Sequence, residues 1–288
     1  MPTLTKAQSK VDTRMASITM PCRDLLKALR KVAPCMPRGE ACYNMCGVLF
    51  EFDRDATRIV ATDGHRLAAF VLAPEARNVQ PLRATVSRKG VKALIKALTA
   101  QRGECTIAAT YSNKATAALH IAGKVFPLEC IDDAFPDWRR VVPRYPEGAM
   151  SGDAKDVLAG IKSFRAAPDA KSGDVALRVR RGSLAANFET PIYEEFDHRI
   201  SRGRWRGTVV KRTRIKEYKA THWTIPATIG SDDTDCEFGI NARYFEDAIK
   251  ATVVKGKVYM RNVNGSGGPI LFTADGSTLT YIVLPKRV

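Results

Sequence analysis

Apolar side chains recur at helical spacing in four stretches of the chain. In the first stretch, residues 21–33, Leu25, Leu29 and Val32 mark one side of a helix, and charged residues mark the other. The same spacing returns in residues 88–98, 153–165 and 241–254. The pattern predicts four amphipathic helices, each with one face directed at a core.

The side opposite the apolar face is cationic in the first three predicted helices. On these sides lie Arg23, Lys27, Arg30, Lys31, Lys89, Lys92, Lys96, Lys155, Lys162 and Arg165. On any single helix, such residues most often only keep a surface solvated. Three helices that repeat the arrangement raise the alternative that these side chains contact a phosphate backbone.

Short runs of residues with high strand propensity separate and follow the helices. They are residues 47–52, 57–62, 67–72, 105–110, 175–180, 269–274 and 279–285. A helix followed by several strands occurs twice before about residue 147 and twice after it, which is an internal repeat. We therefore predict an α+β chain with a tail at residues 1–15 and two domains of similar plan, residues 16–147 and 148–288.

One basic stretch breaks this rhythm. Residues 198–219 hold nine lysines and arginines against a single acid, Glu217. The stretch reads as a long basic loop or hairpin, within an insertion at about residues 198–235. Its role is open at this stage: it could bind DNA, form part of a subunit contact or be flexible.

Composition points to a polyanionic partner. With 46 Lys and Arg against 30 Asp and Glu, the formal net charge is +16, more than solubility requires. No apolar run approaches the roughly 18 residues of a membrane helix, and the first residues lack the apolar core of a signal peptide. We expect a cytoplasmic, DNA-associated protein without membrane contact.

Signatures of enzymes and of bound metals are missing from the sequence. The seven cysteines are scattered, which suits reduced thiols better than disulfides or a zinc site, so we expect no metal and no cofactor. Neither a nucleophile elbow, a phosphate-binding loop nor a zinc-protease motif is found. A metal-dependent nuclease would need acids such as Asp232, Asp233 and Asp235, but these lie in what reads as a solvated turn. A non-catalytic role is expected.

Several segments carry a family resemblance. ATDGHRLA (61–68) within residues 48–72 is the most specific, and AFPDWRRVVP (134–143) is similar to a second motif of the same family. VSRKGVKALIKAL (86–98), FGINARYFEDAIKA (238–251) and YIVLPKRV (281–288) match further segments in the same order. The chain resembles the bacterial DNA polymerase III beta subunit, or beta sliding clamp, family, and specifically its second and third domains.

The resemblance implies a fold and a function. Each domain would be of the DNA-clamp type, a pair of helices packed on antiparallel sheets, and the domains would assemble into a ring. Such a ring is a processivity factor: it encircles duplex DNA and tethers DNA polymerase, after a clamp loader has placed it. The resemblance and the repeated cationic helix faces together favour contact between those faces and DNA.

The number of domains determines the expected assembly. The family's three-domain chains close as dimers, so each domain turns the ring by a sixth of a circle. Two domains per chain would close as a head-to-tail homotrimer. The alternative is a clamp-like protein that forms no ring and instead caps another clamp or sequesters clamp-binding peptides.

The resemblance also implies a hydrophobic pocket that accepts short peptides from polymerases, clamp loaders and repair proteins. The matching positions are Thr62, Gly64, His65, Arg66, Leu67, Pro136, Arg140, Val141, Asn241, Tyr244, Ile282, Leu284, Pro285 and Arg287. Leu67, Pro136, Val141 and Leu284 are expected to wall the socket, and the arginines and Asn241 to bond an extended peptide. Leu284 and Lys286 stand where the family has two methionines, so the peptides bound are expected to differ from the usual motif.

Overall fold

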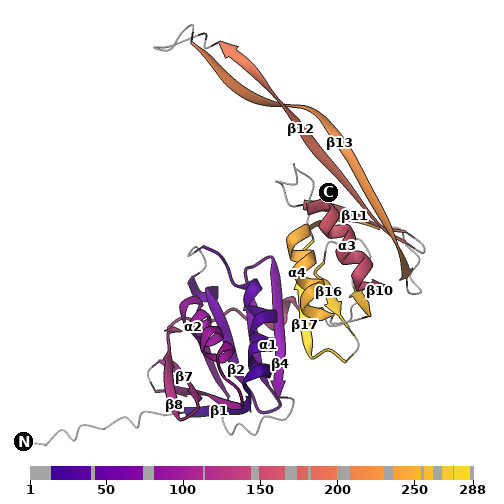
Figure 1. Ribbon diagram of the computed structural model, residues 1–288. Coiled ribbons are helices and arrows are strands. Elements are labelled where there is room, and N and C mark those ends of the chain that lie inside the picture. The colour runs from indigo at the N-terminus through magenta and orange to yellow at the C-terminus, as the bar shows by residue number, and fades with distance from the viewer. Residues whose placement is uncertain are drawn as a thin grey trace, which may run out of the picture. The chain divides into compact units, whose positions relative to one another are not determined.

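The structure is a computed structural model, and it describes residues 14–39, 43–73, 81–112, 114–143, 149–165, 174–180, 183–199, 201, 208–229, 236–253, 256–261, 268–274 and 276–285. The chain divides into two compact units (Figure 1). The first unit contains the chain up to Val142, with Lys250–Thr252 and Asp275–Ile282, and the second contains the remainder. The limits expected for two clamp-type domains, 16–147 and 148–288, stay a prediction. Part of the expected tail, the acids Asp232, Asp233 and Asp235, and Arg287 lie outside the described residues.

The first unit contains two antiparallel sheets and two helices. In chain order its elements are β1 (Arg14–Pro21), α1 (Cys22–Val32), η1 (Ala33–Cys35), η2 (Tyr43–Met45), β2 (Gly47–Phe52), β3 (Thr57–Thr62), β4 (Arg66–Ala73), β5 (Leu82–Ser87), α2 (Arg88–Thr99), β6 (Glu104–Tyr111), β7 (Ala115–Ile121), β8 (Lys124–Leu128), β9 (Cys130–Ile131) and η3 (Trp138–Val141). One sheet has the order β1-β6-β7-β8, and the other contains β4-β3-β2-β5-β9. Val71 N donates to Thr278 O at 3.1 Å, which attaches the later segment to the edge of the second sheet.

The second unit repeats this plan. Its elements are β10 (Ala149–Asp153), α3 (Ala154–Arg165), β11 (Asp174–Arg180), β12 (Ser183–Arg199), β13 (Val209–Ile229), β14 (Cys236–Asn241), α4 (Ala242–Thr252), β15 (Lys257–Arg261) and β16 (Ile270–Thr273). The last strand, β17 (Leu279–Val283), belongs to the first unit up to Ile282. The pairs β11–β12, β12–β13 and β11–β14 correspond to β2–β3, β3–β4 and β2–β5. Likewise, β10–β15 and β15–β16 correspond to β1–β6 and β6–β7.

All four predicted helices and the seven predicted strands are confirmed, and their ends lie within a few residues of the expected ones. Side chains cap the starts of α2, α3 and α4, whereas α1 begins after Pro21 without a side-chain cap. The Asn241 side chain accepts hydrogen bonds from the backbone of Arg243 and Tyr244, and Asp153 accepts one from Lys155 N at 2.8 Å. The α+β class with helices on antiparallel sheets is therefore the observed fold.

The cores are formed by the apolar faces that the sequence pattern marks. Leu25, Leu29 and Val32 of α1 are fully buried, as are Phe50 of β2 and Phe245 of α4. Burying each such side chain stabilises the fold by about 1.5–3 kcal/mol before the entropy of ordering is counted. Because these apolar faces are buried, only the polar side of each helix is available to contact another molecule.

The basic stretch lies on a long hairpin, which confirms one of the two structures expected for it. Strands β12 and β13 pair from Ser183↔Pro226 to Arg199↔Val209, with a register shift at Ile192/Tyr193. Figure 1 shows them as one two-stranded ribbon. Along β12, strand β11 pairs only with the base, from Ser183 to Asn187. We call the remainder, from the pair Phe188↔Thr221 to the pair Arg199↔Val209, the arm.

Candidate functional site

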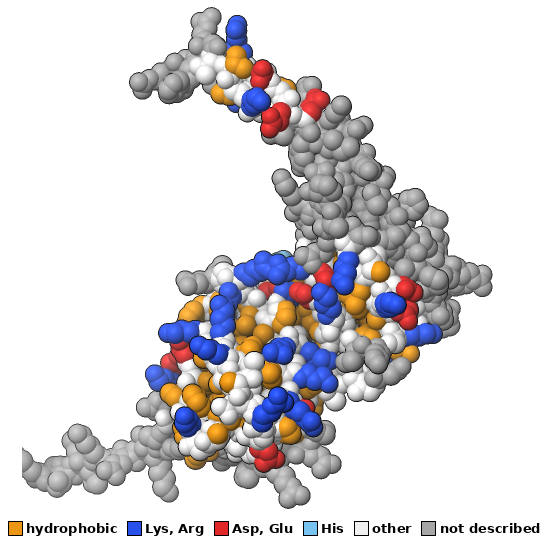
Figure 2. Space-filling view, in the orientation of Figure 1, with side chains coloured by type: hydrophobic (Ala, Val, Ile, Leu, Met, Phe, Trp, Pro, Cys, Tyr) orange, Lys and Arg blue, Asp and Glu red, His pale blue; other side chains and the backbone are white. Residues whose placement is uncertain are grey.

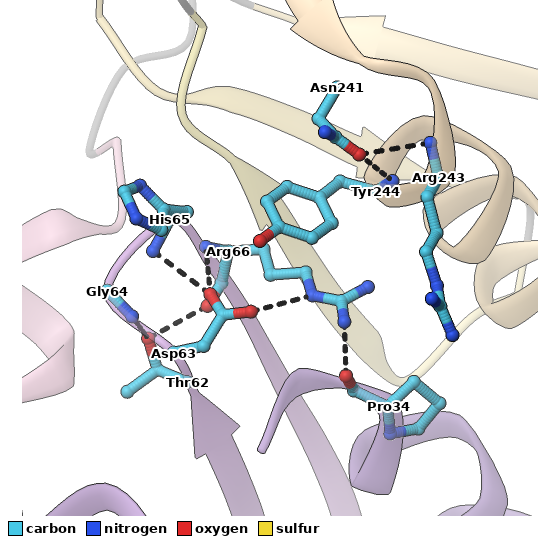
Figure 3. Close-up of polar contacts among 9 residues, drawn as sticks. All are labelled: Pro34, Thr62, Asp63, Gly64, His65, Arg66, Asn241, Arg243 and Tyr244. Carbon is cyan, nitrogen blue, oxygen red and sulfur yellow. Dashed lines mark hydrogen bonds and ion pairs between the residues drawn. The ribbon is translucent and has the colours of Figure 1, made fainter. Parts of the chain in front are cut away.

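The turn between β3 and β4 carries five of the residues predicted to bind a peptide. Asp63 organises it: its Oδ1 accepts hydrogen bonds from the backbone of His65 and Arg66, both at 3.0 Å. Thr62 Oγ1 donates to Arg66 O at 2.8 Å and accepts from Gly64 N at 3.1 Å. Gly64 has φ of 84°, a conformation in which a side chain would be strained. These bonds fix a tight turn that leaves His65 exposed (Figure 3).

Arg66 points inward and holds the turn to the rest of the unit. Its side chain is 5% exposed, and Nε forms an ion pair with Asp63 Oδ2 at 3.1 Å. Its Nη2 donates to the backbone oxygen of Pro34 in η1, which directly follows α1 (Figure 3). Leu67, the next predicted residue, is 2% exposed and belongs to the core of the unit. In this structure, therefore, the turn presents Gly64 and His65, while Arg66 and Leu67 support them from below.

A second group of predicted pocket residues lies around η3, and an ion pair with the buried carboxylate of Glu51 holds that segment in place. Arg139 donates to both oxygens of Glu51, at 2.9 and 2.7 Å, and Glu51 also pairs with Arg83 at 2.7 Å. The Glu51 hydrogen bonds raise the pKa of Arg139 above its ordinary value. With Arg139 fixed in this way, its neighbours are presented outward: Arg140 is exposed and Val141 is 44% exposed. Sequence reasoning did not single out Glu51 or Arg139.

The third group lies at the start of α4 and after β17. Asn241 Oδ1 is engaged by the backbone amides of Arg243 and Tyr244, at 3.1 and 3.2 Å (Figure 3). The Tyr244 side chain is half-buried. The remaining described members are Ile282, which is buried, Leu284, which is exposed, and Pro136 and Pro285, which are half-buried. The pocket that these groups would form together stays a prediction.

The predicted DNA-facing residues lie on exposed helix surfaces. Arg23, Lys27 and Arg30 of α1 are exposed, and so are Lys89, Lys92 and Lys96 of α2 and Lys155 and Lys162 of α3. For Arg165, the structure describes the backbone of α3 but not the side chain. Figure 2 shows lysines and arginines spread over the face of the first unit that bears α1 and α2.

Lys31 differs from the other cations of α1. It is half-buried, and its Nζ lies 5.9 Å from the centre of the Phe70 ring. Burial lowers the pKa of Lys31, and the charge of Lys27 lowers it further. Lys31 therefore packs on the sheet beneath α1, and the other three cations are the ones turned to solvent.

A pocket of about 500 Å³ lies between the two sheets of the first unit. Leu49, Ile131 and Phe135 give it an apolar lining, with Arg83 and Asp132 among its polar residues. None of the site residues predicted from the sequence lines it, because its members come from five separate strands and from residues 132–135.

Among the described residues, no helix is long and apolar enough to cross a membrane, and no group of three or more His, Cys, Asp or Glu is placed to hold a metal ion.

Comparison with known proteins identifies the relatives of this chain. Residues 19–137 match the family model described as DNA polymerase III beta subunit, central domain. The beta sliding clamp of Haemophilus influenzae is 23% identical over 287 residues, covering 100% of this chain and 68% of that protein. The chain resembles the beta sliding clamps along its whole length. The Pseudomonas aeruginosa beta sliding clamp is 23% identical over 265 residues, covering 92% of this chain and 64% of that protein.

Solved clamp structures share the fold. A crystal structure of the DNA polymerase sliding clamp from Pseudomonas aeruginosa superposes with a TM-score of 0.76 at 21% identity, covering 95% of this chain and 67% of that one. The beta subunit of DNA polymerase III from Thermotoga maritima gives 0.76 at 20% identity, covering 100% and 68%. This chain therefore spans about two thirds of the length of the clamps it matches, which fits a likeness to part of the clamp chain.

Proposed function

We propose that this chain is a non-catalytic DNA sliding clamp, which encircles duplex DNA and tethers DNA polymerase to it. The observation that carries the proposal is the repeat. Two units of one topology bury the apolar faces of their helices, and α1, α2 and α3 each turn lysines or arginines to solvent. Cations repeated on equivalent helices suit a phosphate backbone, and contacts of this kind position a duplex without reading its sequence.

The ring is a head-to-tail homotrimer of this 288-residue chain. Two clamp domains turn a third of a circle, and a head-to-tail contact with that rotation closes after three copies. Strand β8 is the end strand of its sheet, and two of its apolar side chains are exposed, Val125 at 59% and Phe126 at 38%. An unpaired strand edge with exposed apolar residues is a template for pairing with another chain. The neighbouring copy pairs with this edge.

Retention on DNA follows from topology and not from tight binding. Phosphate contacts made by exposed lysines are weak and screened by salt, so a closed ring slides while it stays linked to the duplex. A polymerase bound to such a ring stays at high local concentration near the primer end and rebinds before it diffuses away. Peptides of the polymerase and of the clamp loader bind in the pocket predicted around Gly64, Val141, Asn241 and Leu284.

The decisive experiment compares circular and linear DNA. The chain is loaded onto a nicked circular plasmid with a bacterial clamp loader and isolated by gel filtration, and one half is then cut with a restriction enzyme. We expect the protein to stay on the circle and to leave the linear product. Equal retention on both DNAs, or a native mass of one chain by light scattering, would instead support a protein that caps another clamp or sequesters clamp-binding peptides.

A further inference from the structure

The arm is an addition to the repeated fold. In the internal repeat, β12 and β13 take the place of β3 and β4, because each pair follows the same helix and first strand and joins the same neighbours. Strand β3 has 6 residues, whereas β12 has 17. At about 3.3 Å per residue, the difference is about 35 Å of extra ribbon. The first unit forms an equivalent core without such an extension. The extra length of the arm is therefore not needed to fold the second unit.

The end of the arm is strongly basic. Residues 199–212 contain six lysines and arginines and no Asp or Glu. Of these residues, Arg199, Lys211 and Arg212 are described, and all three are exposed. The acids of the arm that the structure describes, Glu194, Glu195 and Asp197, come earlier, on β12. In the strand register, Asp197 lies opposite Lys211 and Glu194 opposite Arg214, so these acids share this part of the arm with cations of β13. Residues 194–214 nevertheless hold seven lysines and arginines against three acids, a net charge of +4.

The pairing inside the arm leaves these cations available. Lys211 Nζ lies 3.6 Å from Glu195 Oε2, with side chains 76% and 68% exposed. An ion pair this open to solvent contributes little and is readily exchanged for another anion. Among the described side chains of the arm, Arg199 and Arg212 have no ion pair within the described part of the chain. Phe196, the strand partner of Arg212, packs edge to face with His198, with ring centres 6.4 Å apart.

An isolated two-stranded ribbon is only marginally stable in water, and a partner that lies along it stabilises it. Beyond Asn187, no third strand pairs with β12 in the described part of the chain. A two-stranded ribbon fits the major groove of duplex DNA, and its cations then reach the phosphates on either side. Because the end of the arm is positively charged, duplex DNA suits it better as a partner than an apolar surface does.

We propose that the far end of the arm binds the phosphate backbone of duplex DNA through Arg199, Lys211 and Arg212, as a contact separate from the cationic helices. The contact goes beyond the proposed ring function, since a closed ring is retained without it. It holds the protein to DNA directly, before or without encirclement, and it does not select a sequence.

The test measures binding to a short, blunt, fluorescein-labelled duplex by anisotropy at several salt concentrations. The ends of such a duplex let a ring escape, so the signal reports direct contact. The variant Arg199→Gln/Lys211→Gln/Arg212→Gln is compared with Arg102→Gln/Arg261→Gln/Lys257→Gln, which removes the same charges at other exposed positions. We expect the arm variant to lose at least about tenfold in affinity at low salt, and its log–log salt slope to fall by about two to three. The control should change by less than about threefold.

A second variant removes the arm as a whole. Phe188 pairs with Thr221 as Thr62 pairs with Leu67, and four residues join the latter pair. Residues 189–220 are therefore replaced by Asp-Gly-His-Arg, the sequence of that four-residue link. We expect this shortened chain to fold and to show the same loss of duplex binding.

The outcomes separate this proposal from the ring. If both arm variants keep the native mass and the retention on circular DNA of the wild type but lose duplex affinity, the arm is a DNA contact. Equal losses in the arm and control variants would overturn it, because net charge alone would then explain the binding. Unchanged duplex affinity with a lower native mass would also overturn it and assign the arm to a second copy of the chain. A wild-type mass of one chain would count against the ring and leave the arm result standing.

Discussion

Arg139 donates two hydrogen bonds to Glu51, at 2.9 and 2.7 Å, across 88 residues of sequence. The Glu51 side chain is 2% exposed, so its charge is compensated by Arg139 and Arg83 instead of water. This pair joins the segment that carries Pro136 and Val141 to strand β2. The position of a predicted binding surface thus depends on a carboxylate in the core.

The change Glu51→Gln should weaken both the fold and the predicted pocket. An amide offers one acceptor oxygen and places its NH2 group against arginine donors, so the hydrogen bonds of Arg139 or Arg83 are lost. We expect the free energy of unfolding to fall by about 1–3 kcal/mol, since both arginines are partly exposed and return to solvent. Urea unfolding measures this loss, and peptide binding should weaken along with it.

The matched control is Asp55→Asn. It also removes one carboxylate from an ion pair with an arginine, Arg58, at 3.3 Å, but the Asp55 side chain is 74% exposed. We expect no measurable loss of stability, because water replaces the lost contact. A Glu51 variant as stable as this control would contradict the role given to the buried pair.

The double change Leu284→Ala with Val141→Asp tests the predicted peptide pocket. Both side chains are at least 36% exposed, so neither change removes a core contact. Binding of a labelled clamp-binding peptide from a bacterial replicative polymerase should be lost, because the apolar socket becomes smaller and charged. Native mass and thermal unfolding should stay at wild-type values. Unchanged peptide affinity would refute the pocket.

Charge removal on the three helices tests the proposed DNA-facing surface. Lys27, Lys92 and Lys162 are exposed, one on each helix. The triple change to Gln should lower the steepness of the salt dependence of DNA binding by up to about three. It should leave the oligomer intact, because none of these side chains packs in a core. A variant with the salt dependence of the wild type would place these lysines away from DNA.

The helices and strands were predictable from the sequence because they depend on local pattern. Leu25, Leu29 and Val32 recur at helical spacing, and all three are buried where that spacing puts them. Arg66 and Leu67 were not interpretable in the same way. Their motif indicates a turn. Only the fold shows that Arg66 is buried by its contacts with Asp63 and Pro34, and that Leu67 is part of the core.

Long-range pairs were beyond the sequence for the same reason. Glu51 is one polar residue in an otherwise apolar strand, and no residue near it in the sequence indicates that it pairs with Arg139. The length of the arm was likewise hidden. The basic residues drew attention to residues 198–219, whereas the strand pairing begins at Ser183, where the composition is ordinary.

We predict that the raised pKa of Cys105 makes the folded state less stable at high pH. Burial raises the pKa of Cys105 to about 12, and the neighbouring Cys22 adds to the shift. In the unfolded chain the thiol loses its proton near its ordinary pKa of about 8.5. Between these values the folded state binds the extra proton, so the stabilising contribution is complete below the unfolded pKa and is lost as pH rises toward 12.

The variant Cys105→Ala isolates this effect. We expect the free energy of unfolding of the wild type to fall more steeply above the unfolded thiol pKa than that of the variant. Urea unfolding at a series of pH values measures both slopes, and lysines and tyrosines contribute equally to the two proteins. Equal slopes for wild type and Cys105→Ala would contradict the prediction.

The exposed edge of β8 provides the sharpest test of assembly. Phe126 is 38% exposed on a strand that, among the described strands, pairs only with β7. The change Phe126→Lys places a charge where the neighbouring copy would pack, and burying that unpaired charge costs several kcal/mol. The native mass by light scattering should fall from three chains to one, while thermal unfolding of the single chain stays cooperative. Lys114→Glu, which alters an exposed residue outside this edge, should leave the mass at three chains. If Phe126→Lys kept the wild-type mass, the ring would have to close through another surface.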